Sequence, residues 1–181
     1  MRLSTQTLVA IAIVASVLGA NAEWINKSGE RLPDAEHRKA IGAFGAQLIL
    51  VPDDEQMFKV WSTPAETVNI STVQSVSVGG QANAFVVFSG CTPDKAGQCD
   101  VTVQFRVYQP NGRPYGGTPP PMEVWQHKPA PAVRMLELSV QYLKVVIEPH
   151  DLLGKYVVVA DVKDHVSGAS LQLSSMFTAT K

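Results

Sequence analysis

The sequence predicts an all-β, antiparallel sandwich of seven to nine strands, and three observations lead to this prediction. Short apolar runs with a period of two begin near Ala46 and recur to the end of the chain. Gly, Pro, Asn and Asp residues separate these runs, as is typical of strands joined by turns. Helical periodicity is scarce in the same region, so a sandwich is favoured over a parallel α/β fold.

Residues 1–22 have the layout of a cleavable secretory signal. Arg2 gives a positive start, residues 8–18 are apolar apart from Ser16, and the small residues Ala20 and Ala22 precede the expected cleavage point. This run is shorter than the roughly 20 apolar residues that a bilayer-spanning helix needs, so we expect cleavage rather than anchoring. We therefore predict a periplasmic or secreted protein, not inserted in a membrane, whose mature chain forms one domain.

Residues 23–45 form a polar segment in which we expect one short helix, around residues 34–41. The sandwich then occupies residues 46–181, and Asp53, Asp54 and Glu55 are expected in an exposed hairpin turn within it. The predicted strands are residues 47–51, 57–61, 73–78, 84–89, 101–108, 122–126, 135–147, 155–162 and 169–178.

The clearest strand is residues 101–108. Val101, Val103, Phe105 and Val107 share one face, and polar residues or tyrosine occupy the other, which predicts a half-buried strand. Residues 135–147 differ, because their apolar positions change from even to odd numbers after Tyr142. Such a change of phase predicts a bulge or a strand that changes sheets.

Cys91 and Cys99 are the only cysteines of the chain, and in an oxidising compartment they predict a disulfide. Their spacing is not that of a C-x-x-C redox pair, and neither has the neighbouring His or Cys that a structural zinc site needs. Turn-forming residues lie between them, so we expect the bond to join two neighbouring strands where a connection leaves the sheet. Closing a loop of this size stabilises a fold by about 2.5 kcal/mol.

A motif in the last thirty residues adds a resemblance to a known family. D-x-x-G-x-Y is followed by an alternating run, and the matching residues are Asp151, Gly154, Tyr156, Val158, Ala160, Val162 and Asp164. The segment resembles the closing hairpin of bacterial extracellular immunoglobulin-like domains. This implies an immunoglobulin-like sandwich with Tyr156 as a tyrosine corner, its ring in the core and its hydroxyl bonded to upstream backbone. The resemblance implies no functional residue, and Val158 stands where antibody-type domains have an intersheet cysteine.

Composition and spacing argue against several function classes. The net charge is −1, and the basic residues are scattered, so we expect no nucleic-acid partner. The four histidines show no metal-ligand spacing, and no Gly-x-Ser-x-Gly elbow is present. We therefore expect no catalytic residues, no metal, no cofactor and no enzymatic activity.

The proline-rich residues 112–131 are the strongest candidate for binding. Prolines hold an extended backbone at low entropy cost, and aromatic side chains can anchor a partner. The candidate partner-binding residues are Tyr115, Pro119, Pro120, Pro121 and Trp125. The alternative is a stiff crossover between sheets, with Trp125 buried.

These features predict an exported, non-enzymatic domain that binds a protein partner, as an accessory of a cell-envelope or secreted assembly. One alternative is a carbohydrate-binding module, which would need Trp61, Tyr115 or Trp125 as an exposed flat platform. Another is an inhibitor or modulator of an exported enzyme, with the proline-rich loop as its plug. An open sheet edge would also allow homo-oligomers.

Overall fold

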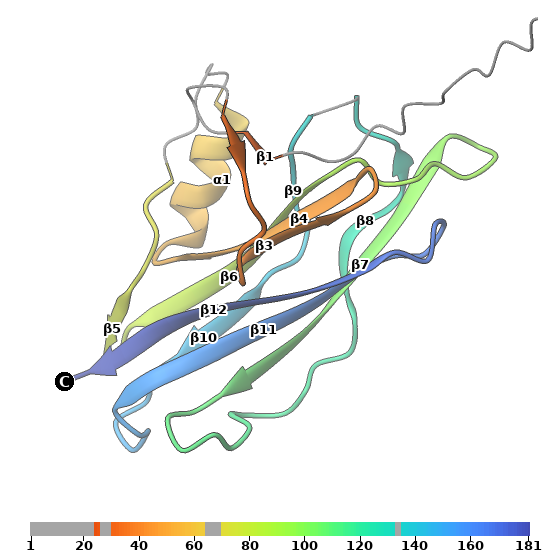
Figure 1. Cartoon of the computed structure of the whole chain (residues 1–181). Helices are drawn as coiled ribbons and strands as arrows, with labels where there is room; N and C mark the ends of the chain where they lie inside the picture. The colour runs from red at the N-terminus through yellow and green to blue at the C-terminus, as the bar shows by residue number, and fades with distance from the viewer. Residues whose placement is uncertain (1–23, 26–29, 64–69, 133–134) are drawn as a thin grey trace, which may run out of the picture.

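The protein folds into two five-stranded sheets that pack against each other (Figure 1). The structure is a computed structural model that describes residues 24–25, 30–63, 70–132 and 135–181. The all-β sandwich predicted from the sequence is confirmed, with ten strands in its two sheets rather than seven to nine. The predicted signal, residues 1–22, lies outside the described residues.

The first sheet, which we call the β6 sheet, is antiparallel. Its strand order is β10–β6–β4–β3, and β9 also pairs with β6. The strands are β3 (Arg38–Ile41), β4 (Phe44–Val51), β6 (Gln81–Ser89), β9 (Glu137–Leu138) and β10 (Leu143–Val146). A separate two-stranded hairpin of β1 (Trp24–Ile25) and β2 (Arg31–Leu32) precedes it.

The second sheet, which we call the β11 sheet, has the order β5–β12–β11–β7–β8. Its strands are β5 (Ser75–Ser77), β7 (Gln98–Tyr108), β8 (Met122–Pro129), β11 (Gly154–Asp164) and β12 (Ser170–Thr180). Only β5 runs parallel to its neighbour, β12. Every predicted strand except residues 57–61 overlaps a strand of one of the two sheets.

The core lies between the two sheets and follows the period of two that the sequence shows. In β7 the four apolar positions 101, 103, 105 and 107 are buried, while the alternate residues are half-exposed. In β12, Leu171, Leu173 and Phe177 are buried as well, and Ser175 of the same face is half-exposed. The largest fully buried side chains are Tyr156, Phe85, Phe88, Phe105 and Phe177.

The short helix expected around residues 34–41 is wrong. Arg38–Ile41 is strand β3, which pairs antiparallel with β4 from Arg38 opposite Gln47 to Ile41 opposite Phe44. Gly42 has φ 57°, a left-handed conformation that glycine adopts at little cost, and it allows a two-residue turn between the strands. Pairing with a fully buried strand therefore outweighs the helix propensity of this polar segment.

The strand expected at residues 57–61 is also wrong, because helix α1 (Asp54–Ser62) occupies this segment. Asp53 is the N-cap, and its side chain accepts a hydrogen bond from the Gln56 backbone N–H at 3.0 Å. Met57 is buried against the outer side of the β6 sheet, with Ile49 and Phe85. The acidic residues 53–55 thus begin a helix and do not form a hairpin turn.

Residues 135–147 change phase as predicted, since Leu138 packs under α1 while Val145 faces the core between the sheets. The cause is a break between β9 and β10, which both pair with β6. Within the break, the Val140 and Gln141 N–H groups donate to backbone oxygens of β8, at 3.2 and 3.1 Å. The chain therefore bridges the two sheets at this side of the sandwich.

The opposite side is bridged too. The Ser174 N–H of β12 donates to the Glu36 carbonyl, which lies just before β3, at 2.8 Å. The Thr178 N–H donates to the Gln74 carbonyl at 2.9 Å, within the pairing of β5 with β12 in the β11 sheet. These two N–H groups of β12 are therefore not free for strand addition, and homo-oligomers through an open edge stay a prediction.

Candidate partner-binding surface

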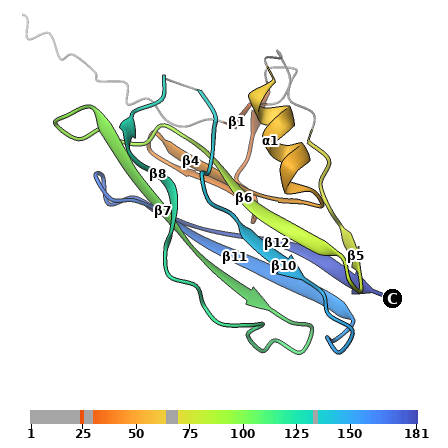
Figure 2. The same ribbon diagram turned by 180° about the vertical axis from the view of Figure 1, so that it is seen from behind.

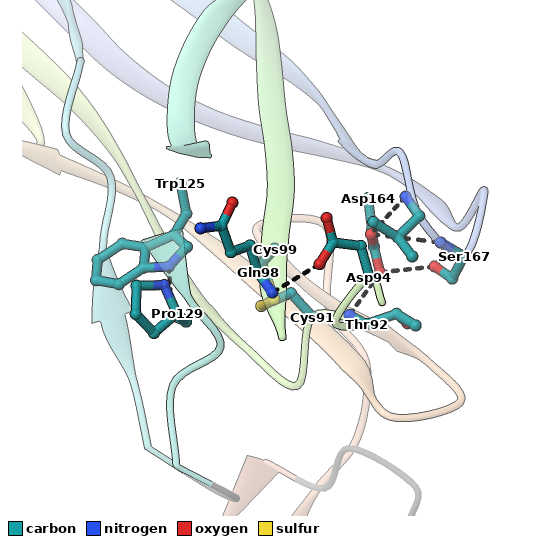
Figure 3. The surroundings of a disulfide bond; sticks show 10 residues. Cys91, Thr92, Asp94, Gln98, Cys99, Trp125, Pro129, Asp164 and Ser167 are labelled. Atoms are coloured by element: carbon teal, nitrogen blue, oxygen red, sulfur yellow. Dashed lines mark hydrogen bonds between the residues drawn. A yellow bond between two sulfur atoms is a disulfide. The ribbon is translucent and has the colours of Figure 1, made fainter. Parts of the chain in front are cut away.

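The cysteines form the predicted disulfide, with their Cα atoms 6.1 Å apart. Cys91 follows β6 and Cys99 lies in β7, so the bond joins the ends of strands from different sheets (Figure 3). The two strands are consecutive in the chain but belong to different sheets, so the bond lies where the connection leaves the β6 sheet, as expected. The disulfide closes the crossover between the sheets.

Asp164, the last residue of the sequence motif, holds the same crossover from the other sheet. Its side chain is completely buried, and Oδ2 accepts hydrogen bonds from the Thr92 N–H at 2.9 Å and the Ser167 hydroxyl at 2.7 Å (Figure 3). Oδ1 accepts from the Val166 N–H at 3.1 Å. A buried carboxylate is stable only with such donors, so this residue has a structural role.

Tyr156 has the geometry expected of a tyrosine corner. Its ring is buried and stacks on Phe177, with centroids 5.4 Å apart, and its hydroxyl donates to the Leu152 carbonyl at 2.9 Å. Burial raises the pKa of this hydroxyl, with a smaller contribution from Asp151. Tyr156 thus ties the turn before β11 to the core.

Tyr115, a predicted anchor for a partner, is half-buried and already engaged within the chain. Its ring meets Tyr156 edge to face at 5.3 Å, and its hydroxyl lies 2.8 Å from the Val146 carbonyl and 2.5 Å from Asp151 Oδ2. Burial and the Asp151 carboxylate raise the pKa of Tyr115 well above its usual range. These contacts fix the loop before β8 to the turn before β11.

Trp125, the second predicted anchor, also packs on the core. Its ring lies 5.8 Å from that of Phe88, and its Nε1–H donates to the Pro129 carbonyl at 3.0 Å. Lys128 places its ammonium 4.9 Å from the ring centroid. The half-buried indole therefore fills the end of the sandwich next to the disulfide.

The prolines lie between these two aromatics, where the segment returns along β7 before β8 begins (Figure 2). Pro119 is half-buried and its carbonyl accepts from Gln104 Nε2 at 2.6 Å, whereas Pro120 and Pro121 are exposed. Proline has no N–H, so these residues cannot extend the β7–β8 ladder, which begins at Met122. This arrangement fits the stiff crossover, and binding at Pro120 and Pro121 stays a prediction.

Tyr115 and Trp125 do not form one site. Trp125 pairs with Val101, whereas the Tyr115 N–H donates to the Val107 carbonyl at 2.8 Å. Six residues of extended strand separate these two points of β7, which is about 20 Å. A single partner side chain cannot contact both rings.

A different surface brings side chains from three strands together, and we call it the outer face. It consists of the exposed or half-exposed residues that point outward where β7, β11 and β12 pair with one another: Thr102, Gln104, Arg106, Tyr108, Lys155, Val157, Val159, Asp161, Lys163, Ser170, Gln172, Ser174, Met176 and Thr178. Helix α1 packs on the other sheet, so no described helix covers this face (Figure 1).

An apolar row crosses the outer face. Val157 pairs with Met176 on one side and with Tyr108 on the other, so the three side chains are adjacent. Met176 is 53% exposed, which is high for a methionine in the middle of a strand. The sequence does not reveal this row, because the alternation gives each strand's outward residues but not the register between strands.

Polar side chains follow the apolar row along the same strands. Arg106 lies two residues from Tyr108 on β7, and the paired residues Asp161 and Gln172 lie four residues beyond the apolar row on β11 and β12. Arg106 Nη2 lies 2.5 Å from Asp161 Oδ2, and Gln172 Nε2 donates to Asp161 Oδ1 at 2.8 Å. These contacts hold planar polar side chains beside the apolar row. The outer face therefore combines an apolar row with fixed hydrogen-bonding groups.

Sequence reasoning also missed a cluster where α1 meets the β6 sheet. Tyr142 stacks on Phe85 with centroids 4.4 Å apart, its hydroxyl donates to the Asp54 carboxylate, and Lys144 Nζ lies 3.4 Å from the same carboxylate. The hydrogen bond from Tyr142 is the largest cause that lowers the pKa of Asp54. This cluster anchors the start of α1 to β10.

The described part of the chain also contains a shallow pocket near α1, of about 50 Å³, lined mainly by Val51, Met57, Val60 and Ile70.

Among the described residues, no group of three or more His, Cys, Asp or Glu side chains is placed to hold a metal ion. No helix within the described ranges is long and apolar enough to cross a membrane.

No protein-family model and no curated protein matches this chain. Among solved structures, a family 123 glycoside hydrolase from Clostridium perfringens is similar with a TM-score of 0.42 and 11% identity, over 77% of this chain and 27% of the hydrolase. A FixG-related protein from Vibrio parahaemolyticus gives a TM-score of 0.37 and 12% identity, over 78% of this chain and 100% of that chain. A Niemann-Pick type C2 protein from Japanese carpenter ant gives a TM-score of 0.35 and 8% identity, over 74% of this chain and 89% of that chain. At these values none of the three defines a family or a function for this chain.

Proposed function

We propose that this chain is an exported, non-enzymatic domain that binds a protein partner, as an accessory of a cell-envelope or secreted assembly. The observation that carries the proposal is the outer face, a regular three-stranded surface crossed by an apolar row near the end of β7. The disulfide supports export, because such bonds persist in oxidising compartments.

The composition of the outer face favours a protein over other ligands. Protein interfaces are enriched in tyrosine, methionine and arginine at their centre. On the outer face Tyr108 and Met176 lie on either side of Val157, and Arg106 lies two residues from Tyr108 on β7. The face is also built on three paired strands, so little ordering entropy is lost when a partner docks.

A carbohydrate-binding module has less support. It would need exposed aromatic rings aligned on one surface, and the rings of Tyr115 and Trp125 pack on the core about 20 Å apart along β7. Trp61, the third candidate, packs against the apolar cluster under α1. None of the three offers a free flat ring for stacking on a sugar.

Site-specific photo-crosslinking tests the proposal. A photo-reactive residue is placed at Val159 on the outer face, at Pro120 in the proline-rich loop or at Glu55 on α1, in the mature chain with its disulfide intact. Each protein is exposed to envelope extract of its own host. We expect one protein adduct from position 159 that unlabelled chain competes away, and none from position 55.

A matched pair of substitutions identifies the surface. Met176→Ser removes the exposed apolar side chain of the face, and Leu153→Ser removes one of similar exposure, 43%, from the turn before β11. The adduct should weaken with the first and persist with the second. Retention of glycans without any competed protein adduct would contradict the proposal and favour the carbohydrate module, and an adduct only from position 120 would move the binding site to the loop.

A further inference from the structure

We propose that the partner of the outer face presents an acidic protein surface. This inference rests on the proposed function, and it adds the chemistry that selects the partner. It starts from the distribution of charge over the molecule.

The outer face is positive on a chain that is otherwise negative. It contains three basic residues, Arg106, Lys155 and Lys163, and one acidic residue, Asp161. The whole chain has 15 basic and 16 acidic residues, so the remainder carries 12 basic and 15 acidic residues. The face therefore has a net charge of +2, whereas the rest of the chain has a net charge of −3.

The two lysines are not neutralised within the described part of the chain. Arg106 is paired with Asp161, but no described carboxylate lies within 4.0 Å of the ammonium of Lys155 or Lys163. By contrast, Lys144 of the other sheet pairs with Asp54. The charge that remains free on the face is thus cationic.

The carboxylates at the border between the outer face and β8 do not make the net charge of the face negative. Glu123 of β8 lies 3.4 Å from Lys128, which neutralises it. Asp100, at the start of β7, accepts a hydrogen bond from Gln126. One border carboxylate leaves a cationic excess across the face.

The two lysines lie at the two ends of the outward row of β11. Lys155 lies two residues before Val157, and Lys163 lies six residues after Val157, so the lysines are about 26 Å apart. A partner that covers the apolar row meets Lys155, and a partner that extends along the whole of β11 also meets Lys163. Acidic groups on the partner would then be attracted during approach and paired at the rim, which gives specificity and a faster association.

The first test uses poly-L-glutamate as a defined acidic polypeptide. Backbone amide NMR signals of the intact mature chain are followed during titration at low salt and again at 0.5 M salt. We expect shifts that concentrate on residues 155–163 and 170–178 and that largely disappear at high salt, because exposed charges are then screened. The cationic polymer poly-L-lysine should cause no such shifts.

Charge reversal provides the matched control. Lys155→Glu with Lys163→Glu should weaken poly-L-glutamate binding by about tenfold or more, which corresponds to the loss of two rim charges. Lys59→Glu with Lys95→Glu reverses two exposed lysines elsewhere and should leave binding within about twofold. Thermal unfolding of both double variants checks that the fold is kept.

The outcomes separate this inference from the proposed function. Equal effects of the two double variants, no shifts on the face, or binding to a sulfated polysaccharide but not to poly-L-glutamate would overturn the acidic-protein inference. A competed adduct at position 159 that survives the Lys155 and Lys163 reversals would leave the proposed function intact. Absence of a competed adduct at every position would contradict the proposed function as well.

Discussion

Replacing Asp164 should destabilise the fold more than any single change on the outer face. The Asp164→Ala variant leaves four donors without their acceptor. Three of them, the Thr92 and Val166 N–H groups and the Ser167 hydroxyl, lie within 3.1 Å of the carboxylate, and the Ser167 N–H lies at the weaker distance of 3.5 Å. A buried or part-buried donor without a partner costs about 1 kcal/mol or more, so the loss should be about 3 kcal/mol. This is a large share of the 5–15 kcal/mol by which domains are typically stable.

The assay is urea unfolding of the oxidised chain, followed by both tryptophan fluorescence and far-ultraviolet circular dichroism. Asp164→Asn keeps one oxygen but turns an amide N–H₂ towards donors, so we expect about half the loss, roughly 1.5 kcal/mol. Val166→Ala, at an exposed neighbour, serves as the control and should change stability by less than about 0.5 kcal/mol. A loss below about 1 kcal/mol for Asp164→Ala would refute the assignment of this carboxylate as the anchor of the crossover.

Three further substitutions test other parts of the structure. Tyr156→Phe keeps the buried ring but removes the hydrogen bond to Leu152, so urea unfolding should show a loss of about 1 kcal/mol. His127→Gly relieves a left-handed residue with φ 52°, and we expect a gain of about 0.5 kcal/mol after the entropy cost of glycine. Tyr142→Phe removes the hydroxyl that lowers the pKa of Asp54, so carboxyl NMR titration should place that pKa closer to its ordinary value.

Each of these expectations has a contrary result. Unchanged stability of Tyr156→Phe would mean that the hydrogen bond from Tyr156 to Leu152 makes no net contribution to stability. A loss of stability with His127→Gly would mean that the imidazole itself stabilises β8.

For Asp54, the folded-state pKa lies below the unfolded value. Its contribution to stability is therefore present above the unfolded pKa and is lost as pH falls through the folded pKa. An unchanged Asp54 pKa in Tyr142→Phe would contradict the named cause.

The strands were predictable where one face of a strand is buried and the other is exposed to solvent. In β7 this gives a strict alternation of apolar and polar residues, which the sequence shows directly. Helix α1 was missed because a short apolar run such as residues 57–61 fits a strand or a helix equally well. The decisive signal was Asp53, a residue type that favours helix N-caps as much as turns.

The candidate surface was much less predictable than the fold. Tyr108, Val157 and Met176 lie far apart in the sequence, and only the register of β7, β11 and β12 makes them adjacent. A shift of one residue in any strand would turn the side chain into the core. The sequence identifies Tyr115 and Trp125 as aromatic residues in a proline-rich segment, but it does not show that their rings pack against the core.

Methyl NMR of the intact mature chain with its captured partner tests the central claim most directly. The account predicts that the Met176, Val157 and Val159 methyl signals shift or broaden on addition of the purified partner. The methyl signals of Leu152 and Leu153, which are also exposed, should not change. The reverse pattern, with Leu152 and Leu153 perturbed and Met176 unaffected, would contradict the assignment of the outer face as the binding surface.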